Sequence, residues 1–296
     1  MTLRPALLHP FGAGPLRRGR TLVVACCAGL ALSAAGPASA GADTGPYAAL
    51  GDSFSSGLGI PTQTDTVCGR SDHNYPTLLA EAIGTASVTD VTCAGAATQH
   101  ITGAQGDIAP QTDAVGADTA VVTLGIGGND LDLAGTIKRC VLLAYLSPNG
   151  APCKTSYSLG GTDEIGSRIN ATAPKVAADL QAIRAKAPQA RIFLVGYPSL
   201  VPDDGSACRG TVPLATGDFP WLRDKTRQLN SVLAQQAAAN GATFVDTYTP
   251  SVGHDACKPA GVRWIEPTDT AAAAGFHPNA AAHRDTAAKI AGLLGG

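Results

Sequence analysis

Two residues far apart in the chain have the chemistry of a nucleophile and a base. Ser53 follows a short apolar run in the segment YAALGDSFSSGLG, and His277 lies near the carboxyl end in FHPN. A serine hydroxyl is a weak nucleophile until a neighbouring base takes its proton. An imidazole, with an ordinary pKa near ~6.5, can exchange that proton at neutral pH. The pair therefore predicts acyl transfer through a covalent intermediate on Ser53, provided that the fold brings the two residues together.

Attack on a carbonyl also needs hydrogen-bond donors for the negative charge that develops on its oxygen. We predict three of them: the backbone N–H groups of Ser53 and Gly95, and the side-chain amide of Asn129. Gly95 lies in CAGAAT and Asn129 in GGND. Glycine at position 95 leaves room for a close backbone approach, and Gly127 and Gly128 permit a turn that aims Asn129 inward.

Other polar residues receive structural interpretations. A carboxylate beside a tight turn usually braces that turn, so we interpret Asp52 and Asp130 as caps. His254 and Asp255 make only two potential ligands, so no metal is predicted, and serine acyl transfer requires no cofactor. Three further histidines are expected on the surface or in loops: His73, His100 and His283.

The elements that must position these residues alternate along the chain. Short apolar runs predict buried strands at 47–51, 119–128, 191–197 and 243–248, with a weaker one at 87–93. Apolar residues at helical spacing predict helices around 165–183, 222–240 and 279–294. Alternating strands and helices imply a parallel sheet covered on both faces, with its site at the carboxyl ends of the strands. Ser53, Gly95 and Asn129 follow three of these strands.

Residues 1–40 have the pattern of a secretory signal peptide. A basic stretch precedes the apolar run 21–32, and Ala38-Ser39-Ala40 matches a cleavage site. We expect its removal to leave residues 41–296 as a single secreted domain, which we expect to be a monomer without an integral membrane span. Without the four arginines of the leader, the chain has 17 Lys and Arg residues and 23 Asp and Glu residues, which gives a formal charge of about −6. This balance argues against a nucleic-acid partner.

The cysteine count points to a disulfide-bonded protein. An even number of cysteines in an exported chain predicts three disulfides. Many pairings are possible, and the most economical joins each cysteine to the next, so that every bridge closes a local segment. Zinc is disfavoured because no Cys-x-x-Cys spacing occurs. The six cysteines outside the leader are Cys68, Cys93, Cys140, Cys153, Cys208 and Cys257.

The blocks GDSFSSG, CAGAAT, GGND and FHPN, in this order, resemble the GDSL esterases and lipases, also called SGNH hydrolases. The resemblance covers essentially all of residues 41–296, and the three expected disulfides resemble the secreted actinobacterial lipase and esterase branch. It implies a flavodoxin-like three-layer α/β sandwich with a central parallel sheet of about five strands. It also implies a carboxylic ester hydrolase with Ser53 and His277 as catalytic residues and Ser53, Gly95 and Asn129 at the oxyanion hole.

The chain departs from the family pattern three residues before the histidine. Many members have an aspartate there that completes a triad, whereas this chain has Ala274. A backbone carbonyl near Ala274 can fix the imidazole tautomer instead, which makes a Ser53–His277 dyad the favoured interpretation. A carboxylate from Asp269 or Glu266 remains the alternative.

The substrate is less well specified than the reaction. Residues 131–146, LDLAGTIKRCVLLAYL, are unusually apolar for a connection, and they either line an acyl-chain pocket or pack on the core. This segment favours esters of acyl lipids, hence a lipase, an esterase or a phospholipase A. The alternatives are a carbohydrate O-acetylesterase of the same fold and a secreted binding protein without turnover.

Overall fold

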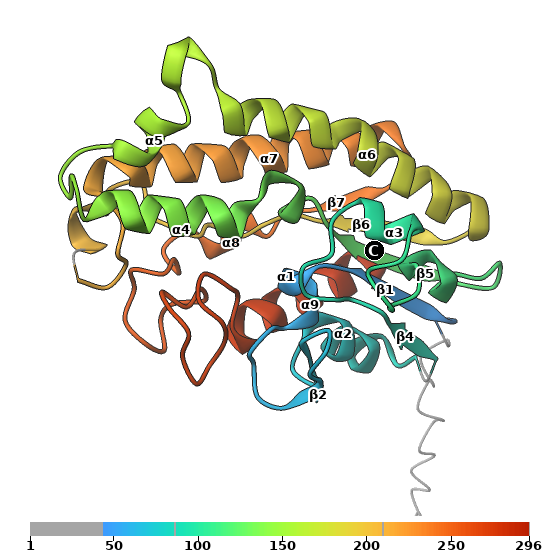
Figure 1. The fold of residues 1–296 in the computed structure, drawn as a ribbon. Helices are drawn as coiled ribbons and strands as arrows, with labels where there is room; N and C mark the ends of the chain where they lie inside the picture. The colour runs from blue at the N-terminus through green and yellow to red at the C-terminus, as the bar shows by residue number, and fades with distance from the viewer. Residues whose placement is uncertain (1–43, 86, 209, 296) are drawn as a thin grey trace, which may run out of the picture. The chain divides into compact units, whose positions relative to one another are not determined.

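A five-stranded parallel sheet lies at the centre of the computed structural model, which describes residues 44–85, 87–208 and 210–295. Its spatial order is β4-β1-β5-β6-β7 (Figure 1). By position in the chain this is the order 2-1-3-4-5 of flavodoxin-like folds, whose ligands bind where the order reverses, next to the first strand. The strands are β1 (Tyr47–Gly51), β4 (Val88–Asp90), β5 (Val121–Gly125), β6 (Arg191–Val195) and β7 (Thr243–Val245).

Helices cover both faces of the sheet, as the apolar strands predict. Tyr47 and Ala49 of β1 belong to the core shared with α2 and α9, whereas Ala48 and Leu50 belong to the core shared with α6 and α7. Figure 1 shows the two pairs of helices on opposite sides of the strands, so the expected three-layer sandwich is confirmed. These helices are α2 (Tyr75–Ile83), α6 (Glu164–Lys186), α7 (Phe219–Ala239) and α9 (Ala280–Gly295).

The predicted strands run too long at their carboxyl ends. The prediction 119–128 corresponds to Val121–Gly125, because the chain turns away from the sheet at Gly127, which has a φ of +115°. The prediction 191–197 ends at Val195. In both cases the excess residues form the loops that carry polar groups at the sheet edge.

Shorter elements are inserted between the main strands and helices, several of them at the carboxyl edge of the sheet. They are α1 (Ser53–Ser56), β2 (Gln63–Asp65), β3 (Arg70–Ser71), α3 (Gln99–Thr102), α4 (Leu133–Ala144), α5 (Pro152–Ser156) and α8 (Tyr248–Ser251). The 3-10 turns are η1 (Gln111–Ala114), η2 (Asn129–Leu131), η3 (Leu159–Gly161), η4 (Gly205–Cys208) and η5 (Thr216–Asp218).

Three disulfides join consecutive cysteines, as the economical pairing predicted. The bonds are Cys68–Cys93, Cys140–Cys153 and Cys208–Cys257. The predicted signal peptide lies outside the described residues. Among the helices that the structure describes, none is long and apolar enough to cross a membrane.

Candidate active site

The turn after β1 presents Ser53 at the first position of α1. Asp52 caps this helix by accepting a hydrogen bond from the Phe54 N–H at 2.9 Å, as the interpretation of Asp52 as a cap predicted. Gly51, with a φ of +151°, makes the turn possible. A Cβ at this position would lie 2.6 Å from the Gly125 carbonyl oxygen and 2.5 Å from Ser55 Oγ, so the turn requires glycine.

The segment before α9 brings His277 to Ser53 from 224 residues away along the chain. His277 Nε2 lies 2.8 Å from Ser53 Oγ. On the other side of the ring, Nδ1 lies 2.8 Å from the carbonyl oxygen of Gly275. That carbonyl requires a proton on Nδ1, which leaves the Nε2 lone pair facing the hydroxyl. Burial lowers the pKa of His277 below its ordinary value, so the imidazole is neutral and able to accept a proton at neutral pH.

Neither of the two candidate carboxylates contacts the imidazole. Asp269 Oδ1 accepts a hydrogen bond from the Gly275 N–H at 2.7 Å and so acts on the peptide next to the histidine. Glu266 is buried, and its carboxylate binds three side chains: Arg263, Thr270 and Asn279. The Glu266 backbone N–H donates to the His277 carbonyl oxygen, and the Glu266 carbonyl oxygen accepts from the Phe276 N–H. Glu266 therefore braces the histidine segment, while the group on Nδ1 is a backbone carbonyl, one residue beyond Ala274.

The three expected oxyanion donors border one cavity together with Ser53 Oγ and His277. This cavity has a volume of about 380 Å³, and Ser53, Gly95, Asn129 and His277 line it. Asn129 Nδ2 donates to the Ala96 carbonyl oxygen at 2.8 Å, which fixes the amide and leaves its second N–H available. Within the described part of the chain, the backbone N–H groups of Ser53 and Gly95 have no hydrogen-bond partner. All three donors are free for a ligand.

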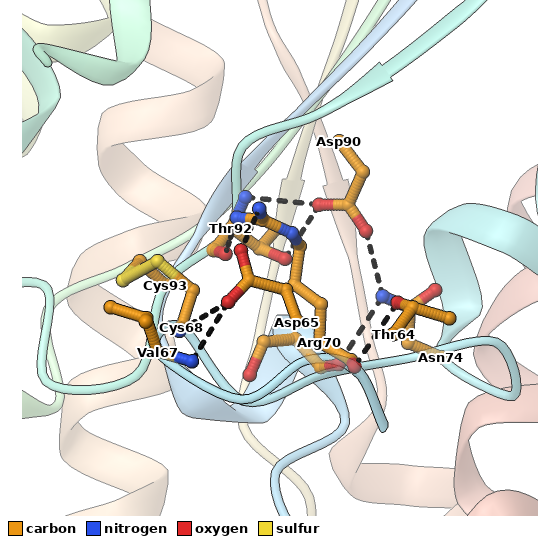
Figure 2. A network of polar contacts seen from close by, with 10 residues as sticks. Thr64, Asp65, Val67, Cys68, Arg70, Asn74, Asp90, Thr92 and Cys93 are labelled. Atoms are coloured by element: carbon orange, nitrogen blue, oxygen red, sulfur yellow. Dashed lines mark hydrogen bonds and ion pairs between the residues drawn. A yellow bond between two sulfur atoms is a disulfide. The ribbon is translucent and has the colours of Figure 1, made fainter. Parts of the chain in front are cut away.

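A polar network holds the loop that carries Gly95 (Figure 2). Arg70 donates to the Thr92 carbonyl oxygen at 3.0 Å and pairs with Asp65. Asp90, at the end of β4, accepts from both the backbone N–H and the hydroxyl of Thr92, at 2.9 and 2.6 Å. The disulfide Cys68–Cys93 closes the network one residue further along. The loop therefore leaves the sheet in a fixed direction, two residues before Gly95.

Asn74 ties this network to the nucleophile helix. Its side-chain amide donates to Asp90 Oδ2 at 2.7 Å and to the Ser56 carbonyl oxygen at 3.2 Å. The positions of Ser53 and Gly95 are thereby linked through side chains as well as through the sheet.

Sequence reasoning missed Tyr197, which connects the nucleophile turn to the Asn129 loop. The Tyr197 hydroxyl donates to Asp52 Oδ2 at 2.5 Å and accepts from the Gly128 N–H at 2.8 Å. Burial raises the pKa of Asp52 to about 7, and the hydrogen bond from Tyr197 opposes this rise. The only sequence signal was the position of Tyr197 at the carboxyl end of the predicted strand 191–197, where site residues gather.

Some expectations for polar residues were wrong. His283 is buried on α9, where its Nδ1 accepts from the Tyr75 N–H at 2.9 Å, and burial lowers its pKa to about 3. Asp130 does not cap a helix but accepts from the Thr98 N–H and hydroxyl at 2.9 and 2.6 Å, which joins two loops of the site. No group of His, Cys, Asp and Glu side chains suited to a metal occurs among the residues that the structure describes.

The apolar segment after Asn129 forms α4, and it both packs on the core and borders the site. Cys140 and Thr136 are buried, whereas Leu133, Ala134, Ile137 and Lys138 line the cavity with Ser53 and His277. A narrower and almost entirely apolar cavity of about 30 Å³ continues behind it. The two cavities share Leu133, Ile137 and Phe276. One face of α4 therefore packs on the core, and another lines the cavity that contains Ser53 and His277.

The sequence is similar to those of known proteins. The sequence profile of the GDSL-like Lipase/Acylhydrolase family matches residues 49–284. The chain is 41% identical to Lipase 2 of Streptomyces coelicolor, over 95% of this chain and 98% of the relative. It is 32% identical to Lipase 1 of the same organism, over 88% and 91% of the two chains.

Solved structures agree as well. The crystal structure of phospholipase A1 from Streptomyces albidoflavus superposes with a TM-score of 0.66 at 27% identity, covering 84% of this chain and 98% of that one. For the extracellular lipase from Streptomyces rimosus the TM-score is 0.64 at 26% identity, with 84% and 99% covered. The match spans the sheet, the nucleophile turn and the histidine segment, so the chain belongs to the GDSL-like lipase and acylhydrolase family, whose members are carboxylic ester hydrolases.

Proposed function

We propose that this protein hydrolyses carboxylic esters of acyl lipids through an acyl-enzyme on Ser53. The observation that carries the proposal is the 2.8 Å separation between Ser53 Oγ and His277 Nε2 at the wall of a cavity. Nε2 takes the hydroxyl proton as Oγ bonds to the ester carbonyl carbon. The same proton then passes from Nε2 to the oxygen of the leaving alcohol, as the bond between that oxygen and the former carbonyl carbon breaks. Water, deprotonated by Nε2, releases the acid and restores the serine.

The donors at the cavity wall receive the charge of each tetrahedral intermediate. The N–H groups of Ser53 and Gly95 are fixed by the backbone, and the Asn129 amide by its bond to Ala96. Fixed donors require little reorganisation during the reaction, and the loss of one typically costs ~10²–10³ in rate.

We propose that a backbone carbonyl replaces the acid of a triad. The Gly275 carbonyl oxygen holds the Nδ1 proton and stabilises the imidazolium by its dipole. Asp269, on the N–H of the same residue, adds negative charge near the ring and raises the pKa of His277, against the larger opposite effect of burial. The dyad is thus assisted by a carboxylate that does not touch it.

The apolar lining of the cavity favours an acyl chain over a small acyl group. Leu133 and Ile137 border both the catalytic cavity and the narrower apolar cavity behind it, and apolar side chains are what an acyl chain binds. The similarity to proteins named lipase and phospholipase A1 supports the same substrate class.

We propose further that the protein is exported and acts outside the cell as a monomer. Three disulfides among the described residues support export, because such bonds persist in oxidising compartments. The Streptomyces rimosus relative, described as extracellular, supports the same location. Mass spectrometry of the N-terminus of the exported protein tests the expected cleavage after residue 40.

Hydrolysis of p-nitrophenyl esters from acetyl to palmitoyl tests the reaction and the chain-length preference. We expect turnover that is lost in Ser53→Ala and His277→Ala, and an organophosphonate adduct on Ser53. Phosphatidylcholine and an acetylated sugar are assayed in parallel. A steep preference for acetyl esters would exclude the acyl-lipid assignment. The absence of both turnover and the Ser53 adduct would favour the alternative of a binding protein without turnover.

A further inference from the structure

The outer face of α4 exposes large apolar side chains next to the active site. Leu142 is 67% exposed, and Tyr145 and Leu146, in the turn that follows the helix, are 78% and 80% exposed. Residues three and four apart on a helix are neighbours, so these three side chains form one patch. We call Leu142, Tyr145 and Leu146 the α4 patch. Soluble monomers rarely expose such groups together unless they bind something.

The α4 patch continues a row of side chains that starts at the catalytic cavity. Ala134 and Lys138, at four-residue steps before Leu142, line the cavity together with Ser53 and His277. Leu146 lies eight residues after Lys138, and the helix and the turn that follows it span about 12 Å over that length. A surface in contact with the patch therefore also reaches the mouth of the cavity. Figure 1 shows α4 (green) at the same end of the sheet as α1.

The patch belongs to a braced element. The disulfide Cys140–Cys153 joins the middle of α4 to α5. α5 is in turn held by Asp218, which accepts from the backbone N–H groups of Cys153 and Lys154 at 3.0 and 2.8 Å. The apolar side chains are thus presented by a helix that is fixed on its inner face, which reduces the entropy lost when they bind a partner.

The charges beside the patch suit a phospholipid surface. Lys138 and Arg139 are exposed on α4, and the Arg139 guanidinium lies over the Tyr157 ring at 4.7 Å from its centroid. In the part of the chain that the structure describes, neither cation forms an ion pair. Helices that lie in a lipid–water interface combine Lys and Arg with Leu and aromatic residues in this manner. Tyrosine, with an apolar ring and a polar tip, suits the same boundary.

We propose that the α4 patch docks the enzyme on the surface of a phospholipid aggregate, with Lys138 and Arg139 near the lipid phosphates. This inference rests on the proposed hydrolysis of acyl lipids and adds how the enzyme reaches them. The docked orientation places the cavity mouth at the interface, so that an ester enters it with a short path out of the lipid.

The first test separates binding from catalysis. The variant Leu142→Gln/Leu146→Gln removes two exposed apolar groups, and Val67→Gln/Leu159→Gln is the control, since Val67 and Leu159 are also exposed but lie outside α4. Co-sedimentation with phosphatidylcholine vesicles is measured for each protein. Because the variant removes two apolar side chains that would each be buried in the lipid, we expect vesicle partitioning to fall about 100-fold or more in the α4 variant. We expect the control to stay within twofold of the unmodified protein.

Turnover is measured on the same proteins with two substrates. We expect fatty-acid release from the vesicles to fall with partitioning, while hydrolysis of dissolved p-nitrophenyl acetate stays within twofold. The variant Ser53→Ala should bind vesicles as the unmodified protein does. Vesicle binding without any hydrolysis by the unmodified protein would reject the proposed function but not the docking surface.

Two outcomes would overturn the docking proposal. The first is vesicle partitioning that is unchanged in the α4 variant or falls equally in the control. The second is a dimer of the unmodified protein, seen by sedimentation velocity, that persists when vesicles are added and that does not form in the α4 variant. That result would assign the patch to a second copy of the chain.

Discussion

The hydroxyl of Tyr197 is a single group whose removal tests how the two loops of the active site are aligned. It is buried, donates to Asp52 beside the nucleophile, and accepts from the N–H of Gly128. Gly128 immediately precedes Asn129, the expected side-chain donor to the oxyanion. The variant Tyr197→Phe keeps the ring and deletes both hydrogen bonds.

The expected magnitudes follow from those two bonds. The Gly128 N–H loses its partner in a buried position, and Asp52 loses its shortest hydrogen bond, so we expect the free energy of unfolding to fall by about 2–4 kcal/mol. Complete loss of an oxyanion donor costs ~10²–10³ in rate, which is the upper limit for a donor that is only misaligned. We expect kcat to fall about 10-fold while KM stays within twofold, since the cavity walls are unchanged.

A double-mutant cycle with Asn129→Ala separates alignment from general loosening of the fold. If Tyr197 acts through Asn129, its replacement should lower kcat by less than about twofold when Asn129 is already absent. The assay is steady-state hydrolysis of p-nitrophenyl butyrate, with urea unfolding for stability. Tyr47→Phe is the control, because the buried Tyr47 hydroxyl bonds to Thr123 Oγ1 at 2.8 Å inside the sheet. It should lower stability but leave kcat unchanged.

The reasoning would be refuted by either of two results. One is a Tyr197→Phe variant with the kcat of the unmodified enzyme. The other is a decrease of kcat that is equally large with and without the Asn129 side chain, which would mean that Tyr197 affects turnover by a route that does not involve Asn129.

Three further predictions concern the histidine segment and its supports. Because burial lowers the pKa of His277, kcat/KM should rise with pH along an acid limb with its midpoint below ~6.5. Asp269→Asn removes a charge that raises this pKa and should therefore move the acid limb to lower pH. A shift of the limb to higher pH would contradict the assignment. Glu266→Gln leaves Arg263 without its charged partner and should lower the free energy of unfolding by about 1–3 kcal/mol in urea titrations, with the position of the acid limb unchanged. Replacement of Cys208 and Cys257 by serine opens a loop of 49 residues and should lower the same free energy by about 2–4 kcal/mol, whereas an unchanged unfolding midpoint would show that the loop is held by other contacts.

The sheet was predictable from the sequence because its strands are buried on both faces. Every residue of β1 and β5 is buried, so both strands appear in the sequence as continuous apolar runs. The carboxyl end of β5 was not predictable to the residue, since Ile126 and two glycines continue past its last paired position. The helix α2 was not predicted, for a different reason. It is short, and its apolar residues pack against α9, from the other end of the chain.

The residues of the site that lie in sequence blocks were predictable, and the side chains that hold them were not. Ser53 and His277 stand in short segments whose residue types already suggest chemistry. Tyr197 and Glu266 act through contacts that only folding creates; the Tyr197 bond to Asp52 spans 145 residues. His283 was expected at the surface but is buried, because nothing in the neighbouring sequence distinguishes it from a solvent-exposed histidine of the last helix.

The wide separation in sequence between Ser53, the proposed nucleophile, and His277, the proposed base, has a consequence for the timing of activity. A ribosome makes the Ser53 turn first, and 224 further residues must follow before the imidazole exists. In the folded domain, the helix that follows His277, α9, packs against α2, near the opposite end of the domain's sequence. An unfinished or truncated polypeptide therefore carries an inert alcohol, and the ability to cut esters arises only once the whole molecule has been made and has closed on itself.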